Sequence, residues 1–327
     1  MSEATTIVVS DIGGTHARFA LATIGSNGAI ELGDVETLST ADFATLHDAW
    51  EAFARSCGGT LPRAASLALA APIVGDHIPL TNNPWSIRRS ELCETLGLDR
   101  YSLLNDFAAI GHAVATAPGT QFKHLSGPEV ELPVEGAITI VGPGTGLGVG
   151  LLWRDGRGGY HVQPTEGGHV EFGPIDEVDD ALVAMLRPIH GRVVAERIVA
   201  GPAIAAIRKV LAQQAGVEIE ELDDRTIWQL GTSGEDGLCE AAVDRFCLSL
   251  GSQAGDYALA HGSHAVVIAG GLGYRIREKL HGSGFAERFC DKSPYQRLMK
   301  QMPVKLIIHP QPGLFGAAAA FASEHLK

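Results

Sequence analysis

Asp11-Ile-Gly13-Gly14-Thr15 is the first segment of this chain that could do chemistry. The apolar runs on either side of it predict two strands joined by a tight turn. The two glycines would permit positive φ angles and close approach of a ligand, and their backbone N–H groups could form a nest for an anion. Asp11 would repel a bare phosphate unless a divalent cation lies between the two. The segment therefore predicts either a nucleotide-phosphate site with metal or an ordinary turn capped by an aspartate.

Two further glycine-rich segments follow strand-like apolar runs. Residues 137–141 precede Gly142-Pro-Gly144-Thr145-Gly146-Leu-Gly148, and residues 265–269 precede Gly270-Gly271-Leu-Gly273. Three such segments in one chain predict backbone loops that converge on one polyanion. None of them continues as Gly-Lys-Ser/Thr or has Gly-x-Gly-x-x-Gly spacing, which disfavours a P-loop nucleotidase and a Rossmann dehydrogenase.

Asp106 follows the strand-like run 101–104 and begins a helical pattern, with Asn105 directly before it. Asn and Asp are common helix caps, so a structural role would explain both residues. Alternatively, Asp106 could accept the proton of a hydroxyl group that attacks a phosphorus atom, because phosphoryl transfer to an alcohol needs such a base or aligner. The residue pattern alone leaves both interpretations open.

Glu166-Gly-Gly-His169 places a carboxylate and an imidazole three residues apart. The two intervening glycines disfavour a helix and predict a loop. The pair could bind sugar hydroxyls, which need both donors and acceptors, or it could be an ion pair or a cap. Glu196 by itself predicts a solvated helix residue. Asn82 and Asn83 suit hydroxyl contacts but are also ordinary turn residues.

Length and charge limit the classes of function. A chain of 327 residues favours two lobes over one core. The net charge of −13 argues against nucleic acid or an anionic membrane as the main partner, but not against ATP, whose phosphates backbone amides and Mg²⁺ can bind locally. No apolar run predicts a membrane span. Five scattered cysteines predict reduced, mostly buried thiols in a cytoplasmic protein.

Strand-like and helical runs alternate along the chain. They predict an α/β fold with a mostly parallel sheet in each lobe, made mixed by the hairpin at Asp11. Ser90 is expected to cap a short helix that ends at Leu96, and residues 121–135 are expected to be an irregular crossing between lobes. A helical stretch is expected within 38–55, where Leu46, Ala49, Trp50 and Phe53 have helical spacing. Further helices are predicted at 106–115, near 179–188, 202–215 and 237–261, and at 312–321.

Together these segments resemble the phosphate-1, phosphate-2 and adenosine segments of the actin-like sugar-kinase superfamily, and more closely the bacterial glucokinase family. The similarity runs from Val8 to about Phe321, and its segments are specific because they occur together and in order. The matching segments are Asp11–Arg18, Leu80–Trp85, Leu104–Phe107, Gly142–Val149, Glu166–His169, Ala195–Arg197, Ala269–Gly271 and Pro312–Gly316.

The resemblance implies a two-lobed actin-like ATPase (ribonuclease-H-like) fold with mixed sheets, flanking helices and an active site in the interlobe cleft. Residues 1–116 and a terminal helix at 312–327 would form the small lobe, and residues 117–311 the large lobe. The implied reaction is ATP-dependent phosphorylation of D-glucose to glucose 6-phosphate. The family is often dimeric, so we expect a homodimer.

The resemblance also implies the roles of individual residues. Asp106 would be the catalytic base, and the sugar ligands would be Asn105, Asp106, Glu166, His169 and Glu196. The nucleotide ligands would be Asp11, Gly13, Gly14, Thr15, Gly144, Thr145, Gly146, Gly270 and Gly271, with Asp11 facing nucleotide-bound Mg²⁺. Related ROK-family kinases carry a cysteine-rich zinc loop after the histidine. No cysteine lies between Cys93 and Cys239, so we expect no structural zinc.

Three alternatives stay open. A kinase for another hexose or for an amino sugar would use the same mechanism with different hydroxyl contacts. A sugar-sensing repressor would need a DNA-binding module, which the net charge and the absence of a helix-turn-helix pattern disfavour. An actin-like assembly ATPase would have no use for Glu166, His169 and Glu196 as a sugar-binding set.

Overall fold

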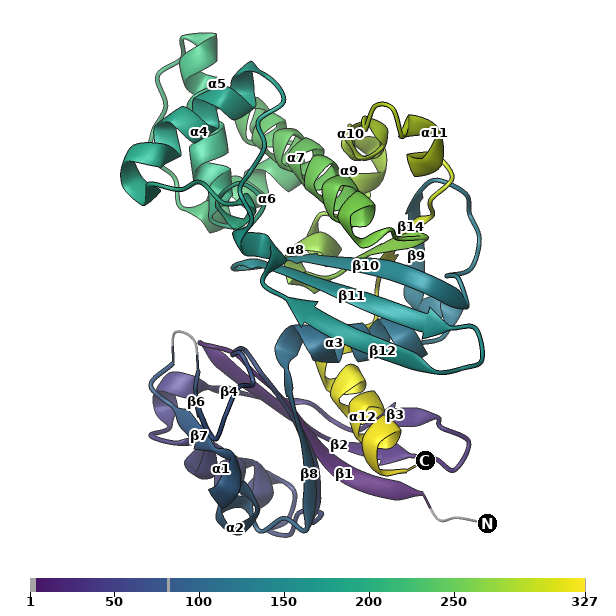
Figure 1. Cartoon of the computed structure of the whole chain (residues 1–327). Coiled ribbons are helices and arrows are strands. Elements are labelled where there is room, and N and C mark those ends of the chain that lie inside the picture. The colour runs from purple at the N-terminus through teal and green to yellow at the C-terminus, as the bar shows by residue number, and fades with distance from the viewer. Residues whose placement is uncertain (1–3, 81–82, 327) are drawn as a thin grey trace. The chain divides into compact units, whose positions relative to one another are not determined.

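The computed structural model describes residues 4–80 and 83–326, which form two compact units (Figure 1). The first unit comprises the described residues of Met1–Ala117 together with those of His309–Lys327, and the second comprises Pro118–Ile308. The C-terminal segment therefore belongs to the same unit as the N-terminal strands, although the whole second unit separates them in the sequence.

A six-stranded sheet forms the centre of the first unit, in the order β3-β2-β1-β5-β8, with β4 also pairing with β2. Pairing is parallel between β1 and β5 and between β5 and β8, whereas β2 is antiparallel to β1, β3 and β4. The expectation of a mixed sheet is confirmed. The expectation of a mostly parallel sheet is wrong, because the hairpins add three antiparallel pairs. The strands are β1 (Thr5–Ile12), β2 (His16–Ile24), β3 (Ile30–Leu32), β4 (Glu36–Ser39), β5 (Ala64–Leu69) and β8 (Arg100–Asn105).

Alternate residues of β1 face two different hydrophobic clusters, as the two-residue period of a strand requires. Val8 and Ile12 pack with α1 (Leu46–Ser56), α2 (Leu92–Leu96) and the hairpin of β6 (His77–Pro79) with β7 (Ser86–Arg88). Ile7 and Val9 pack against the opposite layer, which contains α3 (Asp106–Thr116) and α12 (Pro312–His325). The sheet is therefore covered by helices on both faces.

The two helices of the second layer approach each other very closely at Gly316 of α12. A Cβ atom at this position would lie 1.7 Å from the carbonyl oxygen of Ala109 in α3. Only glycine permits this contact, so Gly316 is a packing residue. The Ala-rich sequence after it lets α12 lie close to both the sheet and α3, as the yellow helix in Figure 1 shows.

The sheet of the second unit has the order β12-β11-β10-β13-β14-β9. Pairing is parallel from β10 to β13 and from β13 to β14, and antiparallel elsewhere, so this sheet is also mixed with a minority of parallel pairs. The predicted irregular crossing contains a strand, β9, which pairs with β14 at the sheet edge. The strands are β9 (Phe122–Ser126), β10 (Glu135–Pro143), β11 (Leu147–Asp155), β12 (Tyr160–Thr165), β13 (Ala265–Ile268) and β14 (Val304–Ile307).

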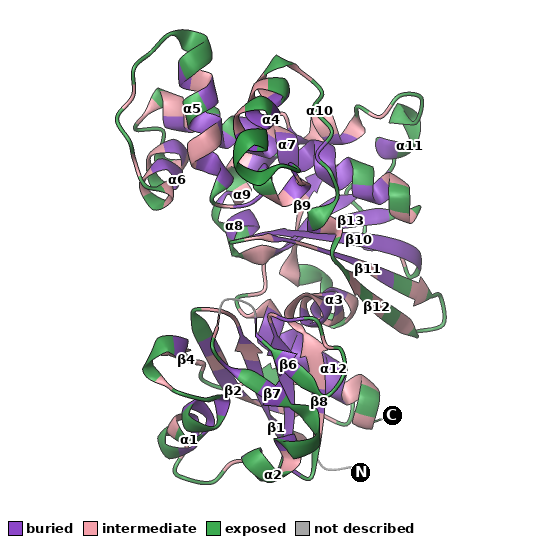
Figure 2. Ribbon diagram, turned by 60° about the vertical axis from the view of Figure 1, so that its left-hand side comes forward, coloured by how far each residue is buried: buried purple, intermediate pink, exposed green. Residues whose placement is uncertain are grey.

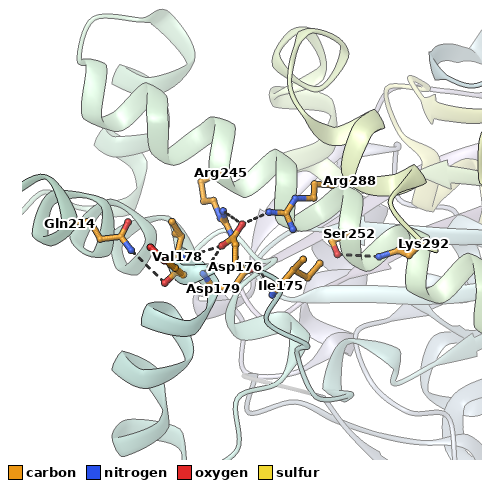
Figure 3. A network of polar contacts seen from close by, with 10 residues as sticks. Ile175, Asp176, Val178, Asp179, Gln214, Arg245, Ser252, Arg288 and Lys292 are labelled. Carbon is orange, nitrogen blue, oxygen red and sulfur yellow. Dashed lines mark hydrogen bonds and ion pairs between the residues drawn. The ribbon is translucent and has the colours of Figure 1, made fainter. Parts of the chain in front are cut away.

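The long helix α7 (Gly237–His261) is the central helix of the second unit and is largely buried (Figure 2). It packs with α5 (Ala203–Ala215), α6 (Asp224–Ser233) and α10 (Phe285–Cys290). An ion-pair network joins it to α4 (Glu177–His190), where Asp176 caps the helix and Asp179 is buried. Arg245 of α7 contacts both aspartates, and Arg288 of α10 contacts Asp176 (Figure 3).

Most predicted helices are confirmed to within a few residues. The helical stretch expected within 38–55 is α1, which begins at Leu46. Ser90 is not a helix cap: its hydroxyl and N–H groups both donate to Asp76, and α2 begins two residues later. Five helices were not predicted from the sequence: α6 and the short helices α8 (Gly270–Arg275), α9 (Arg277–Gly282), α10 and α11 (Gln296–Met299). Among the described residues, no helix is long and apolar enough to span a membrane. The five cysteines are free thiols, of which Cys239 and Cys247 are buried.

Candidate active site

The turn between β1 and β2 is closed by the N–H group of Gly13, which donates to the carbonyl oxygen of His16 at 2.9 Å. The φ angle of Gly13 is not positive, so the conformational freedom expected of this glycine is not used. The hydroxyl of Thr40 donates to the carbonyl of Gly14 at 2.9 Å, and Asn83 Nδ2 donates to that of Gly13 at 3.3 Å. The carbonyl groups of Gly14 and Gly13 therefore point toward Thr40 and Asn83.

Asp11, at the end of β1, is partly buried and forms an ion pair with Arg18 across the hairpin at 3.4 Å. Burial raises the pKa of Asp11, and the charge and hydrogen bond of Arg18 oppose that rise. Gly313 lies against the carboxylate, because a Cβ atom there would be 2.9 Å from Asp11 Oδ2. The carboxylate is therefore held in place at the mouth of the turn.

The two asparagines proposed as hydroxyl contacts have different outcomes. Asn83 behaves as a turn residue: its side chain accepts from the N–H group of Trp85 at 2.8 Å and donates to Gly13. Asn82 lies outside the described residues.

Asn105 and Asp106 lie where β8 ends and α3 begins. Asn105 is the cap of α3: its Oδ1 accepts from the N–H groups of Phe107 and Ala108, and its Nδ2 donates to the carbonyl of Ala71. Asp106 is the first residue of the helix, and its Oδ1 contacts the N–H group of Phe107 at 2.8 Å. The capping role thus falls to Asn105, while Asp106 stands at the helix N-terminus, where the helix dipole favours a negative charge.

The other two glycine segments meet at adjacent strands of the second unit. Gly144–Gly146 forms the tight connection between β10 and β11, with the Gly144 N–H donating to the Gly146 carbonyl at 2.8 Å. Because β13 runs parallel to β10, Gly270 follows the neighbouring strand end. A Cβ atom at Gly270 would lie 2.7 Å from the carbonyl oxygen of Pro143, and its φ of +82° also favours glycine.

Glu166-Gly-Gly-His169 forms a single 3₁₀ turn, η4 (Gly167–His169), which replaces the expected loop. The Glu166 and His169 side chains are 73% and 57% exposed, and their nearest charged atoms are 3.9 Å apart. Both groups are therefore accessible to a ligand. The turn packs on β11, because a Cβ atom at Gly168 would lie 2.3 Å from the carbonyl oxygen of Leu147.

Backbone pairing brings Glu196 next to this turn. Residues 170–172 pair with residues 193–195 through hydrogen bonds from Ala195 N–H to Val170 and from Phe172 N–H to Val193. The 3₁₀ turn η5 (Ala195–Arg197) therefore contacts η4. The expected solvated helix residue is wrong for Glu196, whose Oε2 accepts from the Leu147 N–H group at 2.8 Å.

Two aromatic residues that the sequence analysis did not single out support these turns. The hydroxyl of Tyr257 in α7 donates to the Gly167 carbonyl at 2.7 Å. Trp228 Nε1 in α6 donates to the Gly201 carbonyl at 2.9 Å, and the Gly201 N–H donates to Gly144 at 2.8 Å. No local pattern marks these aromatic residues, because the groups they contact lie far along the chain.

In the part of the chain that the structure describes, no three His, Cys, Asp or Glu side chains gather into a group that could hold a metal ion. Asp11 is the carboxylate beside the expected phosphate turn. A single carboxylate fits a Mg²⁺ ion that takes its other ligands from phosphates and water.

Comparison with known proteins gives matches over nearly the whole chain. The family model described as Glucokinase matches residues 8–324. A glucokinase of Zymomonas mobilis is 50% identical over 319 residues, which cover 98% of this chain and 98% of that protein. A crystal structure of glucokinase from an Antarctic psychrotroph has a TM-score of 0.84 at 33% identity and covers 97% of this chain and 99% of that one.

A more distant structure agrees in fold. A ROK family glucokinase from Streptomyces griseus, solved in complex with glucose and AMPPNP, has a TM-score of 0.60 at 17% identity, covering 97% of this chain and 99% of that one. The predicted actin-like fold class and the predicted family are both confirmed. The chain belongs to the glucokinase family, and its activity is the phosphorylation of glucose.

Proposed function

We propose that this glucokinase uses Asp106 as the base that accepts the proton of the glucose hydroxyl, while Glu166, His169 and Glu196 hold the sugar. The observation that carries the sugar-binding part of this proposal is the convergence of η4 and η5 beside the Gly144–Gly146 turn. Their side chains supply acceptors and an imidazole, which together can pair with several hydroxyl groups.

The proposed base is supported by its position. Asp106 is the first residue of α3, and a carboxylate at that position can accept a proton. Asp106→Asn keeps the size and the helix-starting position but removes the basic oxygen. It should lower kcat by on the order of 10²–10⁴ with a smaller change in glucose KM. A folded variant that keeps more than a tenth of the wild-type kcat would exclude this role.

The proposed sugar set predicts a different kinetic effect. Glu166→Ala, His169→Ala and Glu196→Ala should each raise glucose KM by about 5- to 150-fold, because each leaves polar partners unpaired at a cost of about 1–3 kcal/mol. His161→Ala, which removes an exposed histidine from β12, is the matched control and should change neither KM. If the three variants raise only the ATP KM, the assignment of the two substrate sites is wrong.

ATP is the proposed phosphoryl donor, with Mg²⁺ bound through its phosphates and Asp11 as the nearby protein carboxylate. The residues proposed to line the nucleotide are Gly13, Gly14, Thr15, Gly144, Thr145, Gly146, Gly270 and Gly271. The N–H groups of Gly13 and Gly144 already donate within their turns, to the carbonyl groups of His16 and Gly146, so these two residues would contact the nucleotide through close backbone approach. When bound, the ion would neutralise the phosphate charge. EDTA should stop turnover reversibly without unfolding the protein, and the purified apoprotein should hold no stoichiometric metal. Tightly bound zinc would contradict this proposal.

The remaining proposals concern the two lobes, the oligomeric state and the cellular compartment. Residues 1–116 with 312–327 would act as the small lobe and residues 117–311 as the large lobe. We expect a homodimer, which sedimentation velocity would detect, and a cytoplasmic enzyme, in keeping with its free thiols.

One coupled assay over a panel of hexoses, amino sugars, ATP, ADP and polyphosphate would test the substrate and the donor together. Equal turnover of an amino sugar would overturn the glucose preference.

A further inference from the structure

We infer that Glu196 has a second role: its carboxylate positions the Gly144–Gly146 turn, so that one side chain couples the glucose site to the nucleotide turn. This inference deepens the proposed function and rests on its assignment of Glu196 to the sugar and of the turn to the nucleotide.

The contacts of one carboxylate oxygen carry the inference. Glu196 Oε2 accepts from the N–H group of Leu147, the residue that directly follows the turn, at 2.8 Å. The same oxygen lies against Gly146, because a Cβ atom there would be only 2.4 Å from it. The turn is otherwise closed by its own hydrogen bond from Gly144 to Gly146. Glu196 therefore contacts both Gly146, the last residue of the turn, and Leu147, the residue after it.

The chemistry of a carboxylate allows both roles at once. An ionised carboxylate has two oxygens and about four acceptor sites, and the Leu147 N–H group occupies one of them. The remaining sites can accept from sugar hydroxyl groups. Because the turn and the carboxylate contact each other, a shift of the turn on nucleotide binding moves a sugar ligand. The coupling must be reciprocal, so each substrate changes the affinity for the other by the same factor.

A methyl group added at Gly146 can separate the Glu196 carboxylate from the turn. Gly146→Ala would push the carboxylate away from the turn, and the cost to folding is small because the displaced atom is the far end of a flexible side chain. The φ angle of Gly146 is not positive, so the alanine backbone is not strained. Gly173→Ala is the control in the same unit, since Gly173 belongs to neither proposed substrate site and its Cβ would meet no atom within 4 Å.

The first test measures glucose affinity by calorimetry in the absence of nucleotide, so that nucleotide contacts of Gly146 do not matter. Gly146→Ala should weaken glucose binding about tenfold, and Gly173→Ala should stay within twofold of wild type. In a Glu196→Ala background, Gly146→Ala should add no further loss. Equal glucose affinity of the two glycine variants, while Glu196→Ala alone weakens binding, would overturn the coupling but leave the proposed sugar set intact.

The second test is the reciprocal one and does not depend on the folding of Gly146→Ala. Binding of AMPPNP with Mg²⁺ is measured without glucose. Glu196→Ala should weaken it about fivefold or more, because the Leu147 N–H group loses its acceptor. Glu196→Gln should bind near the wild-type level, because its amide oxygen still accepts from Leu147. Unchanged AMPPNP binding in Glu196→Ala would overturn the inference, and unchanged glucose binding in that variant would instead remove Glu196 from the proposed sugar set.

Discussion

Tyr257→Phe removes one oxygen atom from the support of the proposed sugar turn. The hydroxyl of this buried residue donates to the carbonyl of Gly167, which lies between Glu166 and His169. Burial raises the pKa of Tyr257, so the hydroxyl keeps its proton and remains a donor throughout the neutral range. We therefore expect the variant to leave the core packed but to loosen the turn that presents two sugar ligands.

The expected size of the effect follows from the loss of one hydrogen bond. A neutral hydrogen bond contributes a net of about 1 kcal/mol. The Gly167 carbonyl also accepts from the Val170 N–H group at 3.1 Å, so it keeps one partner in the variant. If this loss falls on sugar binding, glucose KM should rise about fivefold, since 1.36 kcal/mol corresponds to a factor of ten. The ATP KM and kcat should each change less than twofold, because the reacting groups are unaltered.

A coupled assay with glucose and ATP varied separately measures both KM values. Tyr101→Phe is the matched control, since it removes a hydroxyl that donates to the Arg89 carbonyl in the first unit. It should leave both KM values unchanged. This role of the Tyr257 hydroxyl is refuted if Tyr257→Phe leaves the glucose KM at the wild-type value. It is also refuted if the variant raises both KM values equally, which would indicate a general loss of structure.

Three further predictions concern stability. Arg245→Met should lower the free energy of unfolding by about 3–5 kcal/mol, because it leaves the buried Asp179 carboxylate without its cationic partner. Urea denaturation measures this loss, and Arg245→Met/Asp179→Leu should recover much of it. Partial burial raises the pKa of Asp176, but hydrogen bonds and charge from Arg245 outweigh it and hold that pKa well below its usual value. The contribution of Asp176 to the free energy of unfolding is therefore complete above about pH 4 and is lost as the pH falls further. The difference in stability between the wild type and Asp176→Asn should shrink in acid. A difference that stays constant with pH would contradict this. Gly316→Ala should cost about 1–3 kcal/mol through its clash with α3, whereas Gly237→Ala, whose Cβ meets no atom within 4 Å, should show no such loss in thermal denaturation.

The sequence was most informative where a feature is local. The hairpin at Asp11, the strand before Asp106, the helix beginning at Gly237 and the Ala-rich terminal helix all follow from apolar periodicity, glycine and capping chemistry. Motifs in a fixed order also predicted the family and the fold class, because such an order reflects descent as well as local structure. The identity of Asn105 as the cap of α3, in preference to Asp106, was not decided by the sequence.

Errors arose where partners distant in the chain decide the structure. Residues 122–126 form a strand because β14 offers them an edge to pair with, and their own sequence gives only a weak signal. Ser90 fails to cap a helix because Asp76, in another segment, accepts both of its donors. Short helices such as α9 depend on packing around α7, which overrides their modest intrinsic preference.

The sequence by itself determined which residue types are present for phosphoryl transfer to a sugar, and the order in which they occur. Only the tertiary structure decided which of them meet. Glu196 looks like a surface residue in the sequence, yet the pairing of residues 170–172 with 193–195 brings its turn against that of His169. The same folding sets its carboxylate against Gly146. The physical reason is that contacts between distant segments depend on strand pairing and close backbone packing, and neither leaves a local pattern in the residues it joins.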